Sequence, residues 1–154
     1  MSYNKLEYIL NEWSLKMAKL PDIEKSIVLN HPIHHVWDAI ATSKGINGWL
    51  MPNTFQPIVG HDFTMSAGGF GESPCTVTEI VTLEKVAFDW AKDWQLTMLV
   101  DKIDDHTTVF KMIHSGWDDN IETEFNQPHT VVRGLMEEGW ENIVNEKLPY
   151  YLLK

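Results

Sequence analysis

The sequence has little cysteine, no long apolar run and no cluster of positive charge. Cys75 is the single cysteine among 154 residues, which excludes an internal disulfide and a cysteine-based zinc site. No stretch reaches the roughly 18 apolar residues that a membrane-spanning helix needs. The N-terminus also lacks the charged start and apolar core of a secretion signal. We therefore expect a cytoplasmic protein that has no membrane partner.

The charge balance is acidic. The chain carries 12 Lys and Arg against 22 Asp and Glu, a net charge of −10. Proteins that bind nucleic acids usually present a basic face, because neutralising phosphates supplies much of their affinity. No nucleic-acid partner is therefore expected, and the excess negative charge favours solubility.

Hydrophobic periodicity predicts helices and one strand in the first third of the chain. Apolar residues recur about every 3.6 positions over residues 4–20, which predicts a helix that Pro21 ends. Apolar residues alternate over residues 23–29, which predicts a strand. Two short helices follow, one after Pro32 and one over residues 43–50.

The middle of the chain changes to short strands separated by turns. This pattern of short strands and turns indicates an antiparallel meander, because parallel strands would need longer helical connections. The strands are expected at 55–58, 61–66, 75–81, 86–91, 95–102 and 108–115. A long helix begins near Pro128, with Gly139 in its apolar stripe to allow close approach to the sheet, and Pro149 is expected to end or kink it.

This order of elements predicts an α+β fold built from one antiparallel sheet and the long C-terminal helix. About six or seven antiparallel strands form a curved sheet that wraps around the long C-terminal helix, the one element large enough to cover the concave face. Two layers that splay apart leave an apolar cavity between them, and such cavities are common binding sites.

Several short motifs resemble those of the START-like or SRPBCC superfamily, and this resemblance implies the helix-grip fold of the birch-pollen allergen. They occur in the family's order over residues 22 to 148, and they resemble the branch homologous to the C-terminal domain of the activator of the heat-shock chaperone ATPase. The motifs are Pro32-x-x-x-Val36-Trp37-x-Ala39, Trp49, Val59-Gly60 with Phe63, Phe88-Asp89-Trp90, Thr108 to Gly116 ending in His114-Ser115-Gly116, and Gly139-Trp140.

The resemblance implies a START-like domain over residues 22–154, preceded by an N-terminal helical extension over residues 1–21. One departure concerns the second short helix, which reads Trp49-Leu50-Met51-Pro52 where relatives often carry two tryptophans. This departure affects the mouth of the expected cavity.

The leading hypothesis is a protein, monomeric or homodimeric, that binds a hydrophobic aromatic or lipid-like small molecule in that cavity without a cofactor. The resemblance also implies two rivals: a chaperone cofactor that uses an apolar surface on the 4–20 helix, and a polyketide cyclase-like or hydratase-like enzyme. The residues expected to line the cavity are Trp37, Phe63, Met65, Phe88, Trp90, Met98, Phe110, Met112, His114, Met136 and Trp140.

His114 is the residue in this set that could carry chemistry. Phe110, Met112 and His114 share one face of their strand, and Lys111 marks the other face as the outer one. His114 is then either a core histidine whose hydrogen bonds are made within the protein or a polar anchor for the ligand. Catalysis would need an acid–base pair, for which Glu79 is the one possible partner, so the binding hypothesis is favoured over an enzyme and no catalytic residue is assigned.

Other suggestive patterns are interpreted structurally. The histidines at 31, 34 and 35 lack supporting ligands, so no metal is expected. Residues 68–71 are glycine-rich, but strands flank them, which favours a hairpin over a phosphate loop. The acidic stretch at 118–124 lacks the glycine of a calcium loop, and Cys75 lacks the context of a nucleophile.

Overall fold

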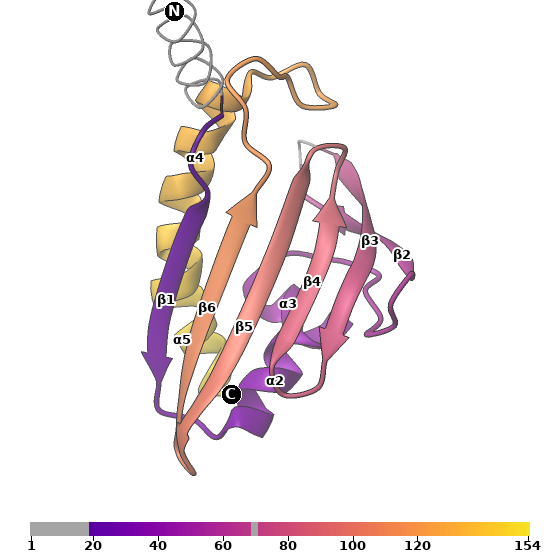
Figure 1. The fold of residues 1–154 in the computed structure, drawn as a ribbon. Helices are drawn as coiled ribbons and strands as arrows, with labels where there is room; N and C mark the ends of the chain where they lie inside the picture. Colours follow the sequence, from indigo (N-terminus) through magenta and orange to yellow (C-terminus); the bar gives the residue numbers. More distant parts are fainter. Residues whose placement is uncertain (1–18, 69–70) are drawn as a thin grey trace, which may run out of the picture.

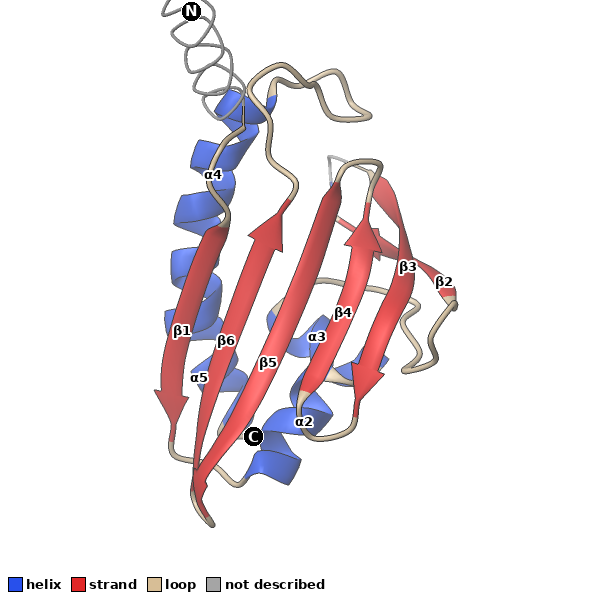
Figure 2. Ribbon diagram, in the orientation of Figure 1, coloured by secondary structure: helices blue, strands red, loops and turns tan. Residues whose placement is uncertain are grey.

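The computed structural model describes residues 19–68 and 71–154, which form one antiparallel sheet with helices on one of its faces (Figures 1 and 2). The spatial order of the strands is β1-β6-β5-β4-β3-β2. The strands are β1 (Ile23–Leu29), β2 (Asp62–Ser66), β3 (Glu72–Val81), β4 (Lys85–Trp90), β5 (Trp94–Asp104) and β6 (Thr107–Ser115). This arrangement confirms the predicted α+β helix-grip fold.

The helices are close to those predicted. Two short helices follow β1, and a long C-terminal helix follows β6. They are α2 (Ile33–Ile40), α3 (Ser43–Trp49), and the continuous run of α4 (His129–Asn142), a π-helical turn η2 (Ile143–Lys147) and α5 (Leu148–Leu152). The predicted helix at 4–20 lies outside the described residues, except for its last two positions. No helix in the described ranges has the length and apolarity needed to cross a membrane.

Three details of the prediction were wrong. Residues 55–58 form no strand; the backbone N–H of Phe55 instead donates to Oδ1 of Asn53 at 3.0 Å. Pro149 does not end the helix, so that part of the prediction was wrong; it lies in the first turn of α5, directly after a π-helical turn that interrupts the regular α-helix. Gly139 does not approach the sheet closely, since a Cβ there would meet no atom of residues 19–68 and 71–154 within 4 Å.

The concave face of the sheet holds the core. Burial alternates along β6, where Thr108, Phe110, Met112 and His114 point inward, as strand geometry requires. Lys111 points outward and pairs with Glu24 at 3.5 Å, which confirms the expected orientation of β6.

Neighbouring strands place matching residues side by side on this inner face. Met98 of β5 lies opposite Met112 of β6, and Leu96 lies opposite His114.

Helix α4 lies beside β1 (Figure 1), and ion pairs attach the two elements. Nζ of Lys25, from the inner face of β1, lies 2.8 Å from Glu137 and 2.7 Å from Glu141. Arg133 Nε donates to the carbonyl oxygen of Pro21 at 2.8 Å. Lys25 is the charged exception in the apolar alternation of β1, and its two carboxylate partners account for its half-buried position.

Candidate functional site

The residues predicted to line a cavity do share the interior. Nine of the eleven are buried, and the other two, Trp37 and Met136, are partly buried against the same core. The alternation of residues along the strands therefore predicted correctly which side chains face the interior. Whether any of these residues contacts a ligand stays a prediction.

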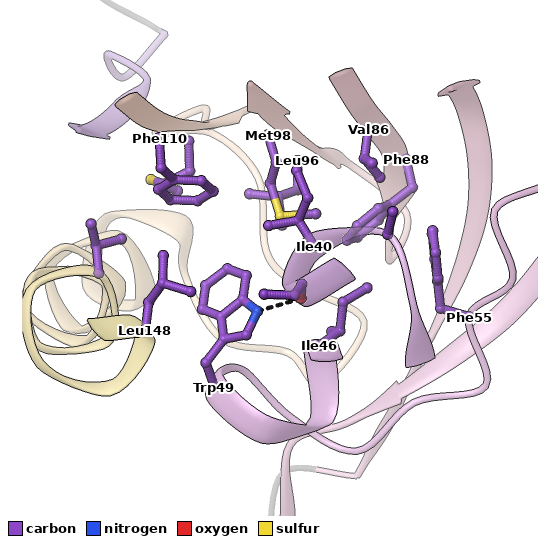
Figure 3. Packing of buried hydrophobic residues seen from close by; sticks show 14 of the residues in the cluster. Ile40, Ile46, Trp49, Phe55, Val86, Phe88, Leu96, Met98, Phe110 and Leu148 are labelled. Atoms are coloured by element: carbon purple, nitrogen blue, oxygen red, sulfur yellow. Dashed lines mark hydrogen bonds between the residues drawn. The ribbon is translucent and has the colours of Figure 1, made fainter. Parts of the chain in front are cut away.

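At the end of the sheet near α2 and α3, the interior is filled by side chains of the protein (Figure 3). Trp49 packs edge-on against Phe110, with ring centroids 5.7 Å apart, and its Nε1 donates to the carbonyl oxygen of Ala39 at 2.7 Å. Ile40 and Ile46 are fully buried beside it. Phe110 therefore packs against the second short helix.

The other end of the interior holds a compact group of aromatic rings, which we call the tryptophan–histidine cluster. Neighbouring ring centroids in it lie between 4.6 and 6.4 Å apart. Its members come from β4, β5, β6, the segment after β6, and α4. They are Trp90, Trp94, His114, Trp117, His129 and Trp140.

His114 lies at the centre of this cluster and is completely buried. Its ring stacks on Trp90 at 4.9 Å, and its Nδ1 accepts a hydrogen bond from Trp140 Nε1 at 3.0 Å. Burial, with smaller contributions from the nearby His129 and Arg133, lowers the pKa of His114 to about 3. The ring is therefore neutral near pH 7, and because Nδ1 accepts, Nε2 carries the proton.

The cluster contains buried N–H groups that have no acceptor. His114 Nε2, Trp90 Nε1 and Trp94 Nε1 find no hydrogen-bond partner among residues 19–68 and 71–154. Buried polar groups in folded proteins are nearly always paired, so three unpaired donors on adjacent rings are unusual. By contrast, Trp117 Nε1 donates to the carbonyl oxygen of His114 at 3.1 Å.

Two more buried polar atoms without hydrogen bonds belong to a pair of neighbouring residues. These residues are His129, the first residue of α4, and Asp93, in the turn between β4 and β5. Nε2 of His129 lies 3.8 Å from Oδ2 of Asp93, and both atoms are buried without a hydrogen bond to the described residues. Nδ1 of His129 accepts from the backbone N–H of Asp118 at 3.2 Å, which places the ring proton on Nε2. Burial lowers the pKa of His129, although Asp93 acts in the opposite direction.

The sequence did not reveal Trp94, Trp117, Asp93 and His129 as site residues. Trp94 begins a strand, and the other three lie on a turn, a loop and a helix start, where periodicity assigns no face. The residue types offered one signal that could have identified the site, since tryptophan and histidine recur in the sequence on either side of His114.

Other predicted features lie elsewhere. Glu79 pairs with Lys85 at 2.8 Å on the partly exposed side of β3 and is not a partner of His114. Nε2 of His35 lies 2.7 Å from the carbonyl oxygen of Leu152, while the ring of His31 is 5.1 Å from that of His35. Burial raises the pKa of the Cys75 thiol to about 12, which suits a structural residue.

Hollows open on the surface that the described residues form. One of about 380 Å³ lies along β2, β3 and β4 and includes Phe63 and Cys75 in its wall. The other, of about 330 Å³, borders the tryptophan–histidine cluster at Trp117 and has Asp93 in its wall. Residues Lys19, Leu20, Asp22, Asp93, Gly116, Trp117, Asp118 and Ile121 line this second hollow.

Comparison with known proteins identifies the relatives of this chain. Residues 30–152 match the model of the family described as activator of Hsp90 ATPase homolog 1-like protein. The chain belongs to this family. Membership in the Hsp90-activator-like family confirms the resemblance seen in the sequence, in both superfamily and branch.

Solved structures agree with this assignment. Protein BH1534 of Bacillus halodurans is 35% identical with a TM-score of 0.78, and the match covers 88% of this chain and 99% of that one. Protein MLL2253 of Mesorhizobium loti is 22% identical with a TM-score of 0.72, over 86% and 96% of the two chains. The Aha1 dimer of Colwellia psychrerythraea is 14% identical with a TM-score of 0.65, over 81% and 91%. No curated protein matches the chain.

Proposed function

We propose that this protein binds a small molecule with an apolar, aromatic body and a neutral hydrogen-bond acceptor, such as a ketone oxygen. The observation that carries the proposal is the set of three buried N–H donors, on Trp90, Trp94 and His114, that find no acceptor among the described residues. A ligand oxygen placed among these rings would satisfy donors that otherwise remain without an acceptor.

The electrostatics of the cluster favour a neutral acceptor over an anion. His114 and His129 are both neutral near pH 7, because burial lowers the pKa of each. The carboxylates of Asp93 and Glu124 each have a buried oxygen without a partner in the described structure. These carboxylates would repel a negatively charged ligand. Moving an anion into this apolar interior would cost more than moving a ketone there.

The walls around the cluster suit a ligand that must displace side chains to enter. Met98 and Met112 face each other across β5 and β6, and Met136 lies half-buried on α4. Methionine side chains are flexible and polarizable, so they can repack around an apolar ligand at low cost.

Matched ligands test this proposal by isothermal titration calorimetry. Fluorenone carries a ketone, fluorene lacks it, and fluorene carboxylate replaces it with an anion. We expect fluorenone to bind about tenfold or more tighter than fluorene, which corresponds to one or two buried hydrogen bonds. The carboxylate should bind more weakly than either. Failure of all three to bind would refute the binding function.

Variants connect the affinity to the N–H donors. Trp94→Phe and Trp90→Phe keep an aromatic ring and remove the donor, so each should weaken fluorenone binding more than fluorene binding. Trp49→Phe is the matched control, since Trp49 Nε1 is already paired with Ala39 and lies away from the cluster. Equal losses for the two ligands in Trp94→Phe would show that its N–H is not the contact.

The rival role as a chaperone cofactor has one supporting observation in the described residues. Val131 and Leu135, one turn apart on α4, are 54% and 63% exposed and form a small apolar surface. The apolar surface predicted on the 4–20 helix falls almost wholly outside those residues. If none of the ligand series binds, a pull-down with a heat-shock chaperone becomes the next test, with Leu135→Asp as the variant that removes this surface.

A further inference from the structure

We infer that the segment between β6 and α4 opens to admit the ligand, and that residues 19–22 fasten this segment when it is closed. We call residues 116–128 the strap and residues 19–22 the N-terminal arm. Figure 1 shows the strap as the loop that runs beyond the end of the sheet between β6 and α4. This role rests on the proposed function, because it concerns access to the same site.

The tryptophan–histidine cluster is closed to solvent. All six of its rings are buried, and the most exposed of them, Trp94, is 7% exposed. The N–H groups of Trp90, Trp94 and His114 that find no acceptor in the described residues also have almost no accessible surface. A ligand therefore reaches these groups only after part of the surrounding wall has moved.

The parts of this wall are held with unequal strength. Strands β4, β5 and β6 are joined by continuous antiparallel ladders. Helix α4 is anchored by Trp140 inside the cluster and by the ion pairs of Lys25. The strap lies outside the ladders of the sheet and contributes Trp117 to the cluster. Segments with few backbone hydrogen bonds to the rest of a protein open at the lowest cost, so the strap is the part expected to move.

Hydrogen bonds at Trp117 and its neighbour hold the strap closed. The indole Nε1 of Trp117 donates to the carbonyl oxygen of His114 at 3.1 Å, and the carbonyl oxygen of Trp117 accepts from the backbone N–H of Leu20 at 3.2 Å. The backbone N–H of Asp118 donates to Nδ1 of His129 at 3.2 Å. The bond from Leu20 comes from the N-terminal arm, so the arm fastens the strap from outside the cluster.

The N-terminal arm is itself fixed to α4. Nε of Arg133 donates to the carbonyl oxygen of Pro21 at 2.8 Å, and Nη2 of Arg133 donates to that of Asp22 at 3.4 Å. Strand β1 begins directly afterwards, at Ile23. The arm is therefore a fixed support, and opening requires the strap to move away from it.

Space for this movement exists beside Trp117. The hollow of about 330 Å³ lies between the strap, the N-terminal arm and the β4–β5 turn, and Trp117 is in its wall. The Trp117 ring lies 4.6 Å from that of His114 and 4.7 Å from that of Trp94, so its outward movement uncovers both. Gly116, with φ of +95° and its Cα packed against the carbonyl oxygen of Asp93, supplies the pivot.

A reversible disulfide between the arm and the strap tests this inference in the full chain. Lys19 and Asp118 are antiparallel partners, and the flanking bond from Leu20 to Trp117 makes them a non-hydrogen-bonded pair. Such pairs hold their Cα atoms about 4.5 Å apart, which a disulfide can span. Lys19→Cys combined with Asp118→Cys should lock the strap when oxidised and release it when reduced. Cys75 is buried and its thiol pKa is raised to about 12, so it does not compete.

Deuterium exchange of the indole N–H groups, followed by NMR, measures opening without any ligand. We expect the N–H groups of Trp90 and Trp94 to exchange about tenfold or more slowly in the oxidised lock than in its reduced form. Ser26→Cys combined with Lys111→Cys is the control disulfide, because these partners on β1 and β6 close a loop of similar length away from the strap. It should leave the exchange of Trp94 within about twofold, since that exchange proceeds through local opening.

A second pair of variants loosens the strap instead of locking it. Leu20→Pro removes the N–H that donates to Trp117, whereas Leu20→Ala keeps it. The exchange of Trp94 should be about threefold or more faster in Leu20→Pro than in Leu20→Ala, the effect of one lost hydrogen bond.

Stopped-flow fluorescence with fluorenone tests the consequence for binding. The oxidised lock should slow association about tenfold or more and leave the Kd within about twofold, because the strap controls access and not affinity. Weaker equilibrium binding to the locked form would overturn the inference, since the strap would then belong to the binding surface.

The exchange measurements decide the inference separately from the ligand. Unchanged exchange of Trp90 and Trp94 in the oxidised lock, or equal rates in Leu20→Pro and Leu20→Ala, would overturn it, because the interior would then open elsewhere. Slow exchange in the lock without fluorenone binding in either form would support the strap and refute the ketone site. The two failures are therefore distinguishable.

Discussion

His114 illustrates how a single side chain combines packing with hydrogen bonding. Its ring contacts Trp90, Trp94, Trp117 and Trp140, while Nδ1 is paired and Nε2 is left with a proton and no acceptor in the described structure. The alternation of Phe110, Met112 and His114 along β6 was enough to predict that this residue faces inward. Its tautomer could not be predicted, because it depends on Trp140, 26 positions later in the chain.

The low pKa of His114 predicts a pH dependence of stability. The pKa falls from 6.5, the ordinary value, to about 3 in the folded protein. Between these values the unfolded chain binds more protons, so the free energy of unfolding decreases as the pH falls below about 6.5. From about pH 7 to about pH 5, this group alone should remove about 2 kcal/mol.

Urea denaturation at both pH values, in the wild type and in His114→Phe, measures this contribution. The wild type should lose about 2 kcal/mol more on acidification than the variant does. The comparison cancels other titrating groups, including His129, whose pKa is also lowered. Identical losses in the two proteins would show that His114 does not change protonation on unfolding.

At the scale of elements, the strands were predictable and the segments between them were not. The inner faces of β5 and β6 followed from alternation, and β1 was predicted at its observed bounds. Residues 55–58 alternate weakly and include Pro57, which has no N–H to donate to a sheet, and the local hydrogen bond from Phe55 N–H to Asn53 Oδ1 helps to determine their path instead. The Asp93–His129 pair joins a turn to a helix start, a juxtaposition that the order of elements does not specify.

The C-terminal helix should depend on one anchor. Trp140 is 1% exposed and donates to His114, so Trp140→Ala removes both a large buried ring and a hydrogen bond. We expect it to lower the free energy of unfolding by about 3–5 kcal/mol. Leu135→Ala, on the exposed side of the same helix, is the control and should cost less than about 0.5 kcal/mol. Chemical denaturation of both variants checks the difference, and similar costs would contradict the anchoring role.

Glycines in α4 and in the segment after β6 should respond in opposite directions to alanine. A Cβ at Gly134 or Gly139 would meet no atom of the described residues within 4 Å, and both glycines lie in a helix. Alanine at either position should stabilise the protein by about 0.5–1 kcal/mol. Gly116→Ala should destabilise it, because the Cβ collides with Asp93 and φ is +95°. Thermal unfolding of the three variants measures the signs, and a destabilised Gly139→Ala would restore the idea of close packing there.

At the scale of the whole molecule, a ligand that binds only the folded state must stabilise it. Fluorenone at ten times its Kd should raise the free energy of unfolding by about 1.4 kcal/mol. Thermal shift measurements at several ligand concentrations would follow this rise. His114→Phe, which lacks one of the proposed donors, should show a smaller shift at the same concentrations. A shift of equal size in the variant would argue that the ligand binds elsewhere.

The crowding of indole rings at one end of the interior gives the protein an optical property. Four of its seven tryptophans, Trp90, Trp94, Trp117 and Trp140, form a chain of rings with centroids 4.7–6.4 Å apart. At such separations the electronic transitions of neighbouring indoles couple, and excitation energy migrates from ring to ring. Near-ultraviolet circular dichroism should therefore show a strong exciton signal that arises from this cluster. A molecule that reaches any one of the four rings changes the emission of all of them, so the protein carries its own spectroscopic reporter of the site.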